Sequence, residues 1–307
     1  MTSLVSRFLR RDPRHAPFPF VVGMNRSGTT LLRMMLDAHP DLTIPPETHF
    51  VPALIKASKG EDATPESALE AMKSAREWED FEISDEEMLG ALRALPALRP
   101  GPAVRAFYEI YAERQDKPRY GEKTPTYVQN MKLIQRALPE AHFVHVIRDG
   151  RDVALSVLDR TVRELTAGDI ARRWRKKVLK ARGDAPALEH YLEIRYEDLI
   201  LETEPTLRRV CDFCALDWHD DLLRYHERSA DRLQEMARTL PGGGRSQELT
   251  VERRLATHAM TTKPPSADRV QRWRKQMSEQ QRLEFEERAG DLLAELGYPV
   301  GEPVDAT

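Results

Sequence analysis

The sequence has few cysteines, no long apolar run and little net charge, and each absence excludes a class of protein. Its 307 residues carry a formal net charge of -3. So small a charge gives no general attraction to nucleic acid or to an anionic membrane surface. Without an apolar stretch of about twenty residues, the sequence predicts no membrane span. The arginine-rich segment 1–14 has no long apolar centre, so we expect no secretory signal and a cytoplasmic location.

Cys211 and Cys214 are the only cysteines in the chain. Two residues separate them in a segment with helical periodicity, so they lie about one turn apart on one helix face. No second pair is present to complete a zinc site. We therefore expect two ordinary thiols in a reducing compartment, and no metal centre.

A lysine is missing from a segment that otherwise resembles a nucleotide-binding loop. Residues 23–30 follow an apolar run and read GMNRSGTT. They match the spacing G-x-x-x-x-G-K-[ST] except that Thr29 stands in place of the lysine. Backbone amides of such a turn bind anions, whereas the lysine serves the β- and γ-phosphates. Its absence favours a nucleotide without a γ-phosphate, with Arg26 as the cation. An ordinary strand–turn–helix explains the loop alone equally well.

Strand-like and helical segments alternate along most of the chain. This alternation predicts an α/β fold in which a P-loop-like parallel sheet is flanked by helices. The expected strands cover residues 18–24, 43–44, 119–122, 142–148 and 191–195. The expected helices cover residues 29–38, 127–138, 152–160, 168–180, 202–214 and 278–296. In such sheets, ligands bind at the carboxyl ends of the strands.

We predict a single domain over residues 1–307, with an α/β core formed by segments 16–55 and 118–300. Prolines interrupt residues 56–117, which are expected to form a helical insertion that covers the substrate side. After Trp218 the pattern becomes irregular. Residues 241–265 are expected to be a lid or a disordered loop.

A second anion site is predicted where the apolar run 142–147 ends. The first polar residue there is Arg148, whereas an NTPase would carry an aspartate for Mg²⁺. An arginine binds phosphate without a metal, and Ser156 lies eight residues later, about two helical turns. The alternative is a structural salt bridge from Arg148 to Asp149 or Asp152, with Ser156 on the helix surface.

With these motifs the chain resembles the sulfotransferases that use 3′-phosphoadenosine 5′-phosphosulfate (PAPS). Residues 26–30, RSGTT, resemble that family's 5′-phosphosulfate loop. Arg148 and Ser156 resemble its 3′-phosphate signature, and residues 120–125, YGEKTP, resemble its Lys-Thr segment. The resemblance implies PAPS as sulfuryl donor. The nucleotide-binding residues it implies are Arg26, Ser27, Gly28, Thr29, Thr30, Arg148, Ser156, Tyr196 and Lys263.

The bacterial and protein-tyrosine branches of the family are the most similar to residues 26–50. The resemblance implies that Glu47 is the catalytic base and that Lys123 and Arg26 stabilise the developing charge. His49 is the rival base, because an ordinary histidine titrates near neutral pH. The cytosolic branch has a catalytic histidine two residues after its lysine, where this chain has Pro125.

We therefore expect PAPS-dependent transfer of a sulfuryl group to a hydroxyl of a small molecule, such as a metabolite, lipid or sugar, without a metal. The oligomeric state is left open. Peptide tyrosine sulfation is the alternative, although eleven acidic residues in segment 61–87 fit acidic peptides poorly. A kinase, which would need Mg²⁺, and a non-catalytic nucleotide-binding module are alternatives from other classes.

Overall fold

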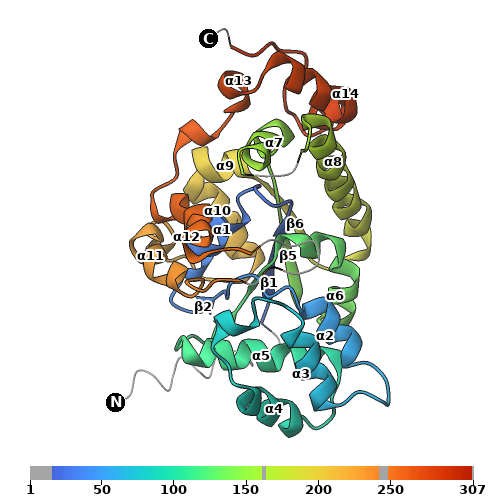
Figure 1. The fold of residues 1–307 in the computed structure, drawn as a ribbon. Helices are drawn as coiled ribbons and strands as arrows, with labels where there is room; N and C mark the ends of the chain where they lie inside the picture. Colours follow the sequence, from blue (N-terminus) through green and yellow to red (C-terminus); the bar gives the residue numbers. More distant parts are fainter. Residues whose placement is uncertain (1–15, 161–163, 241, 243–247, 306–307) are drawn as a thin grey trace.

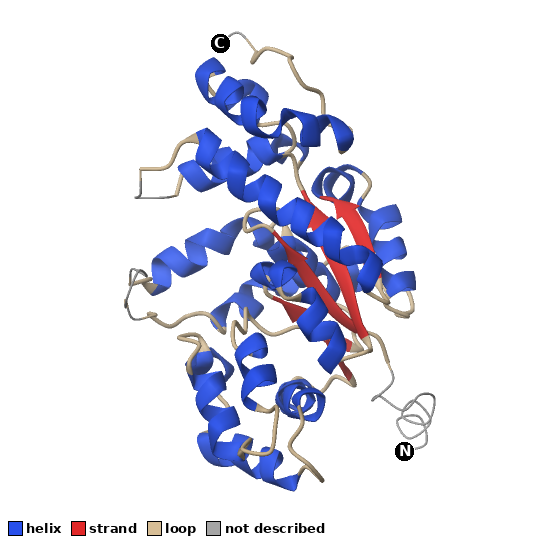
Figure 2. Ribbon diagram, turned by 90° about the vertical axis from the view of Figure 1, so that its right-hand side faces the viewer, coloured by secondary structure: helices blue, strands red, loops and turns tan. Residues whose placement is uncertain are grey.

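Four parallel strands form the central sheet of the computed structural model, which describes residues 16–160, 164–240, 242 and 248–305. The strand order is β4-β1-β5-β6, with β1 and β5 in the middle (Figures 1 and 2). The strands are β1 (Phe18–Gly23), β4 (Glu122–Lys123), β5 (Ala141–Ile147) and β6 (Tyr191–Arg195). The residues of β1 and β5 are all buried, as expected for parallel strands covered on both faces. The predicted parallel sheet is confirmed.

Helices cover both faces of this sheet (Figure 1). On one side α1, α9 and α10 pack against the strands, and on the other side lie α6 and α8. The helices of the core are α1 (Thr29–Asp37), α6 (Met131–Ala137), α7 (Gly150–Leu158), α8 (Ala167–Asp184), α9 (Tyr196–Leu201) and α10 (Thr203–Phe213). Cys211 and Cys214 are free and buried in and just after α10, and burial raises the pKa of their thiols to about 11 and about 12.

The predicted insertion is helical and begins earlier than expected, at Val51. It lies at the bottom of Figure 1 and consists of α2 (Val51–Ala57), α3 (Pro65–Lys73), η2 (Trp78–Phe81), α4 (Asp85–Ala94) and α5 (Pro100–Arg114). Edge-on contacts among Phe50, Phe81 and Phe107 form its core. These aromatic pairs bury a large apolar area between short helices.

The pairing of the strands corrects two predicted strands, 43–44 and 119–122. The predicted strand 119–122 is broken into β3 (Arg119–Tyr120) and β4, because Gly121 donates its amide hydrogen to the carbonyl of Thr43. β3 pairs in parallel with β2 (Leu42–Thr43) in a separate sheet of two strands. The predicted helix 127–138 is likewise divided into the 3-10 helix η3 (Pro125–Gln129) and α6.

The segment after Trp218 is more regular than predicted. It contains η5 (Asp220–Leu222), α11 (His226–Gln234), α12 (Val251–His258), η6 (Ala259–Thr262), η7 (Ala267–Arg269), α13 (Trp273–Gln276) and α14 (Glu279–Glu295). The expectation of an irregular or disordered loop over 241–265 is therefore wrong for residues 251–262, which are helical, whereas a lid role stays a prediction. Positions 241 and 243–247 lie outside the described residues. In the described part of the chain, no helix is both long and apolar enough to cross a membrane.

Candidate active site

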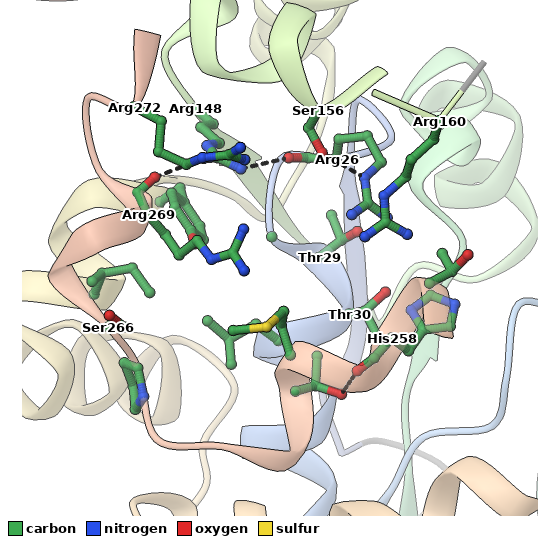
Figure 3. Close-up of a pocket in the computed structure, with 18 of the residues that line it drawn as sticks. Arg26, Thr29, Thr30, Arg148, Ser156, Arg160, His258, Ser266, Arg269 and Arg272 are labelled. Atoms are coloured by element: carbon green, nitrogen blue, oxygen red, sulfur yellow. Dashed lines mark hydrogen bonds between the residues drawn. The ribbon is translucent and has the colours of Figure 1, made fainter. Parts of the chain in front are cut away.

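A cavity of about 490 Å³ opens at the carboxyl ends of β1 and β5 (Figure 3). Its walls come from the loop after β1, from α1, α7 and α9, and from the late segment 256–272. Among the described residues, the charged side chains in its lining are those of Arg26, Arg148, Asp159, Arg160, Arg269 and Arg272. Five cations with one carboxylate make the cavity suited to a ligand with several negative charges.

The amino terminus of α1 provides backbone donors to this cavity. Gly28 caps the helix in the left-handed conformation with φ 96°, and no described side chain forms a capping hydrogen bond to the first-turn amides. A Cβ at Gly28 would lie 2.3 Å from Cδ2 of Tyr196, so only glycine fits here. Gly28, Thr29 and Thr30 line the cavity. Ser27 is buried outside that lining and donates its amide to the carbonyl of Met24, so its amide is already occupied.

Arg26 connects the two predicted phosphate sites. It has a positive φ of 77°, and its Nε donates a 3.0 Å hydrogen bond to Oγ of Ser156. Burial, followed by repulsion from Arg160 and Arg148, lowers the pKa of its guanidinium to about 10. Arg26 therefore remains charged at neutral pH. A bound anion would relieve the repulsion among these arginines.

Arg148 is held at the end of β5 by several partners. Its Nη2 lies 3.3 Å from Oδ2 of Asp152 and donates a 2.7 Å hydrogen bond to the carbonyl of Arg269. The guanidinium stacks over the ring of Tyr196 at 4.3 Å. The structural ion pair considered in the sequence analysis therefore exists with Asp152. Arg148 and Ser156 nevertheless both line the cavity, so this pairing does not remove them from the site.

Lys123, Glu47 and His49 form a second polar group beside Thr30. Nζ of Lys123 lies 2.7 Å from Oε1 of Glu47 and 3.4 Å from Oγ1 of Thr30. Nε2 of His49 lies 3.2 Å from Oε2 of Glu47. Burial would raise the pKa of Glu47, but Lys123 and His49 outweigh it and hold that pKa below its ordinary value. Glu47 also outweighs burial at His49 and raises the pKa of that imidazole. Glu47 is therefore ionised.

A buried hydrogen-bond cluster fixes the position of Glu47. Thr48 points away from the cavity into the protein interior. There its Oγ1 donates a 3.2 Å hydrogen bond to Oε2 of Glu122 and lies 2.8 Å from the hydroxyl oxygen of Tyr127. The hydroxyl of Tyr108 also donates to Oε2 of Glu122. Glu122 precedes Lys123 in β4, so the two side chains point to opposite faces. One strand thus orients the Lys123 ammonium and anchors the segment that carries Glu47.

Replacing Glu122 with glutamine is expected to remove part of the pH dependence of stability. Burial raises the pKa of this carboxyl to about 7. Because the folded state keeps a proton that the unfolded state loses, the wild type should lose on the order of 3 kcal/mol between about pH 4.5 and 7. Urea unfolding at several pH values measures this loss. The exposed Glu113→Gln variant should keep the wild-type pH dependence, and an identical pH dependence in Glu122→Gln would contradict the assignment.

Some residues of the cavity were not predicted from the sequence, and the predicted Lys263 lies outside the cavity. His258, Arg160 and Tyr225 line it, although no sequence motif marked them. Arg269 and Arg272 of the late segment also line it. The predicted nucleotide-binding Lys263 is exposed and outside the lining. Its carbonyl accepts a 2.6 Å hydrogen bond from Tyr225, so the structure gives its side chain no contact with the cavity.

Comparisons with known proteins add a family match. A model of the sulfotransferase family matches residues 17–220. The chain is 26% identical to protein-tyrosine sulfotransferase A of Caenorhabditis elegans over 226 residues, which cover 70% of this chain and 54% of that protein. It is 26% identical to the protein-tyrosine sulfotransferase of Drosophila melanogaster over 223 residues, which cover 70% of this chain and 41% of that protein. The chain thus spans about half the length of the curated relatives it matches.

Two solved structures share the fold. The sulfotransferase domain of the Synechococcus PCC 7002 olefin synthase aligns with a TM-score of 0.58 and 22% identity, covering 92% of this chain and 95% of that chain. The sulfotransferase domain from the curacin biosynthetic pathway aligns with a TM-score of 0.60 and 19% identity, covering 93% of this chain and 99% of that chain. At these identities the likeness supports the fold alone.

The curated relatives correct two predictions. A small-molecule acceptor was expected, whereas these relatives are named for the tyrosine of proteins, so that prediction is wrong. The cytoplasmic location, which was expected from residues 1–14 and from the two thiols, is likewise contradicted by these protein-tyrosine sulfotransferase relatives. Eight of the eleven acidic residues in segment 61–87 are exposed, and none of the eleven lines the cavity, so they do not count against an acidic peptide there.

Proposed function

Because the chain belongs to the sulfotransferase family, we propose that it transfers the sulfuryl group of PAPS to the phenolic hydroxyl of a tyrosine in a protein or peptide. PAPS carries negative charge at its 3′-phosphate and at its 5′-phosphosulfate. The observation that carries the proposal is one continuous cavity with cations for both ends. Arg148 stands toward one end, Arg26 and the α1 amino terminus stand beside Thr30, and Ser156 lies within hydrogen-bond distance of Arg26 (Figure 3).

Glu47 and Lys123 supply the chemistry next to Thr30. In an in-line displacement, the acceptor oxygen attacks sulfur, and the bond from sulfur to the bridging oxygen of the 5′-phosphate breaks. The phenolic proton passes to the Glu47 carboxylate, while the leaving electron pair stays on the 5′-phosphate. Lys123, Arg26 and the amides of Thr29 and Thr30 face that developing charge, which is an electrostatic role of the oxyanion-hole type.

A kinase fits these residues less well. The γ-phosphate clamp would need a lysine at position 29, and a carboxylate is expected at the strand end where Arg148 stands. A non-catalytic nucleotide-binding module would not need Lys123 buried against Glu47. The division into core and insertion, the absence of a metal and the absence of a nucleic-acid partner stay predictions.

Transfer of radiolabelled sulfate from PAPS to a tyrosine peptide tests the proposal. The reaction is run in EDTA, with a control peptide that has phenylalanine in place of the tyrosine. We expect label in the tyrosine peptide alone, and a parallel reaction with ATP and Mg²⁺ should transfer no phosphate. Label found only on free phenols or sugars would overturn the acceptor, and phosphate transfer would overturn the reaction.

A further inference from the structure

His258 is a cavity residue that the proposed reaction has not yet used. It is the last residue of α12, and Figure 3 shows its ring on the same side of the cavity as Thr30 and Arg26. Its carbonyl accepts a 2.7 Å hydrogen bond from Thr261, which ties the helix end to η6. Among the described residues, the imidazole itself has no hydrogen-bond partner.

The charged side chains that act on His258 include those of the proposed reaction, Lys123, Glu47 and Arg26. Burial, and then the positive charge of Lys123, lower the pKa of His258 to about 3, with further effects from Glu47, Arg26 and Arg33. The ring is therefore neutral at physiological pH and carries one N–H donor and one acceptor nitrogen. A neutral imidazole beside fixed cations is a poor base for a phenol. It can still donate a hydrogen bond to charge that develops during a reaction.

We propose that His258 is a catalytic residue, whose imidazole N–H donates a hydrogen bond to the bridging oxygen between the 5′-phosphate and the sulfuryl group of PAPS. This inference rests on the proposed function and deepens it. As the bond from sulfur to that oxygen breaks, the oxygen gains negative charge and the hydrogen bond strengthens. The imidazole loses no proton, because the proton released in the reaction is that of the tyrosine hydroxyl, and it passes to Glu47.

Kinetics of His258→Ala and His258→Gln test this role, with the exposed Glu252→Gln on the same helix as control. Alanine should lower kcat by about a hundredfold. Glutamine, which keeps an N–H donor, should recover most of that loss. Affinity for adenosine 3′-phosphate should change little in both variants, because this nucleotide lacks the 5′-phosphate, whereas 3′-phosphoadenosine 5′-phosphate (PAP) keeps the oxygen and should bind the alanine variant more weakly. A wild-type kcat in the alanine variant, or an equal loss of affinity for PAPS and adenosine 3′-phosphate, would overturn the role.

A binding measurement separates this inference from the proposed reaction. In protein labelled with ¹⁵N-histidine, the His258 signals are those missing from the His258→Gln variant. Adding PAPS without an acceptor should shift these signals more than adding adenosine 3′-phosphate, which lacks the 5′-phosphate, does. If PAPS shifts them but no tyrosine peptide is sulfated, the proposed acceptor fails while the His258 contact stands. Equal shifts with both nucleotides would refute the contact even in an active enzyme.

Discussion

Turnover is expected to fall by about a hundredfold to a thousandfold when Lys123 is replaced by methionine, as is typical for loss of one preorganised donor. The Lys123 side chain is only 2% exposed, and its ammonium lies between Glu47 and Thr30. Methionine fills much of the same space without the charge. PAP affinity should change little, because Arg26, Arg148 and the α1 amides remain. The measurement is kcat from initial rates together with the PAP dissociation constant from calorimetry.

The residual activity of Lys123→Met should also shift along the pH axis. Lys123 is the strongest of the charges that hold the pKa of Glu47 down. Without it, burial raises that pKa, so the carboxylate base takes up a proton at higher pH and activity is lost earlier on acidification. Lys117→Met is the matched control, since Lys117 is a partly buried lysine whose ammonium bonds the carbonyls of Asp37 and Leu42 and not the groups that Lys123 contacts. Its kcat should stay at the wild-type level. If Lys123→Met also turns over normally, Lys123 has no place in the mechanism.

The sequence predicted best those features that depend on short segments. The loop after β1 depends on Gly28. Arg26 lies three residues after the end of β1, and Arg148 directly follows β5; both strands are apolar runs that the sequence shows clearly. Because parallel strands end at the same edge of a sheet, their strand-end residues meet without further information. The prediction of one site for the two anionic groups of a nucleotide therefore depended only on where the strands end.

The late segment could not be predicted in this way. α12 is polar, with few apolar residues to mark a buried face, and its position depends on a partner far away in the chain. Arg254 on α12 forms a buried ion pair with Asp80 of the helical insertion. Its Nη1 also donates a 2.8 Å hydrogen bond to the carbonyl of Arg238. This tertiary pairing brings His258 to the cavity. No local pattern encodes a contact between residues that are 174 positions apart.

The separation of β2 and β3 from the main sheet has a similar cause. Both strands have only two residues, too few for a periodic pattern. Their pairing is supported by Arg232 of α11, which bonds Asp37 and Thr43. Such a contact depends on how distant helices pack, so the sequence predicted the strands and not their sheet.

Affinity for PAP should fall about tenfold to a hundredfold when Arg148 is replaced by glutamine, the cost of losing hydrogen bonds to a charged phosphate. Affinity for adenosine 5′-phosphate, which lacks the 3′-phosphate, should change little, because Arg26 and the α1 amides still hold the 5′ end. Calorimetry with the two nucleotides gives both dissociation constants. Ser156→Ala should weaken PAP binding less than Arg148→Gln, since a hydroxyl contributes a neutral hydrogen bond.

The same substitution also breaks an ion pair, and this effect must be separated from the loss of phosphate binding. Arg148→Gln leaves the carboxyl of Asp152 without its cation, although Oδ1 still accepts a 2.8 Å hydrogen bond from the amide of Trp273. Burial already raises the pKa of Asp152. Adding Asp152→Asn removes the unpaired charge, so the double variant should regain stability and still bind PAP weakly. Recovery of PAP affinity in the double variant, or an equal loss for both nucleotides in Arg148→Gln, would mean that Arg148 supports the loop and does not bind the 3′-phosphate.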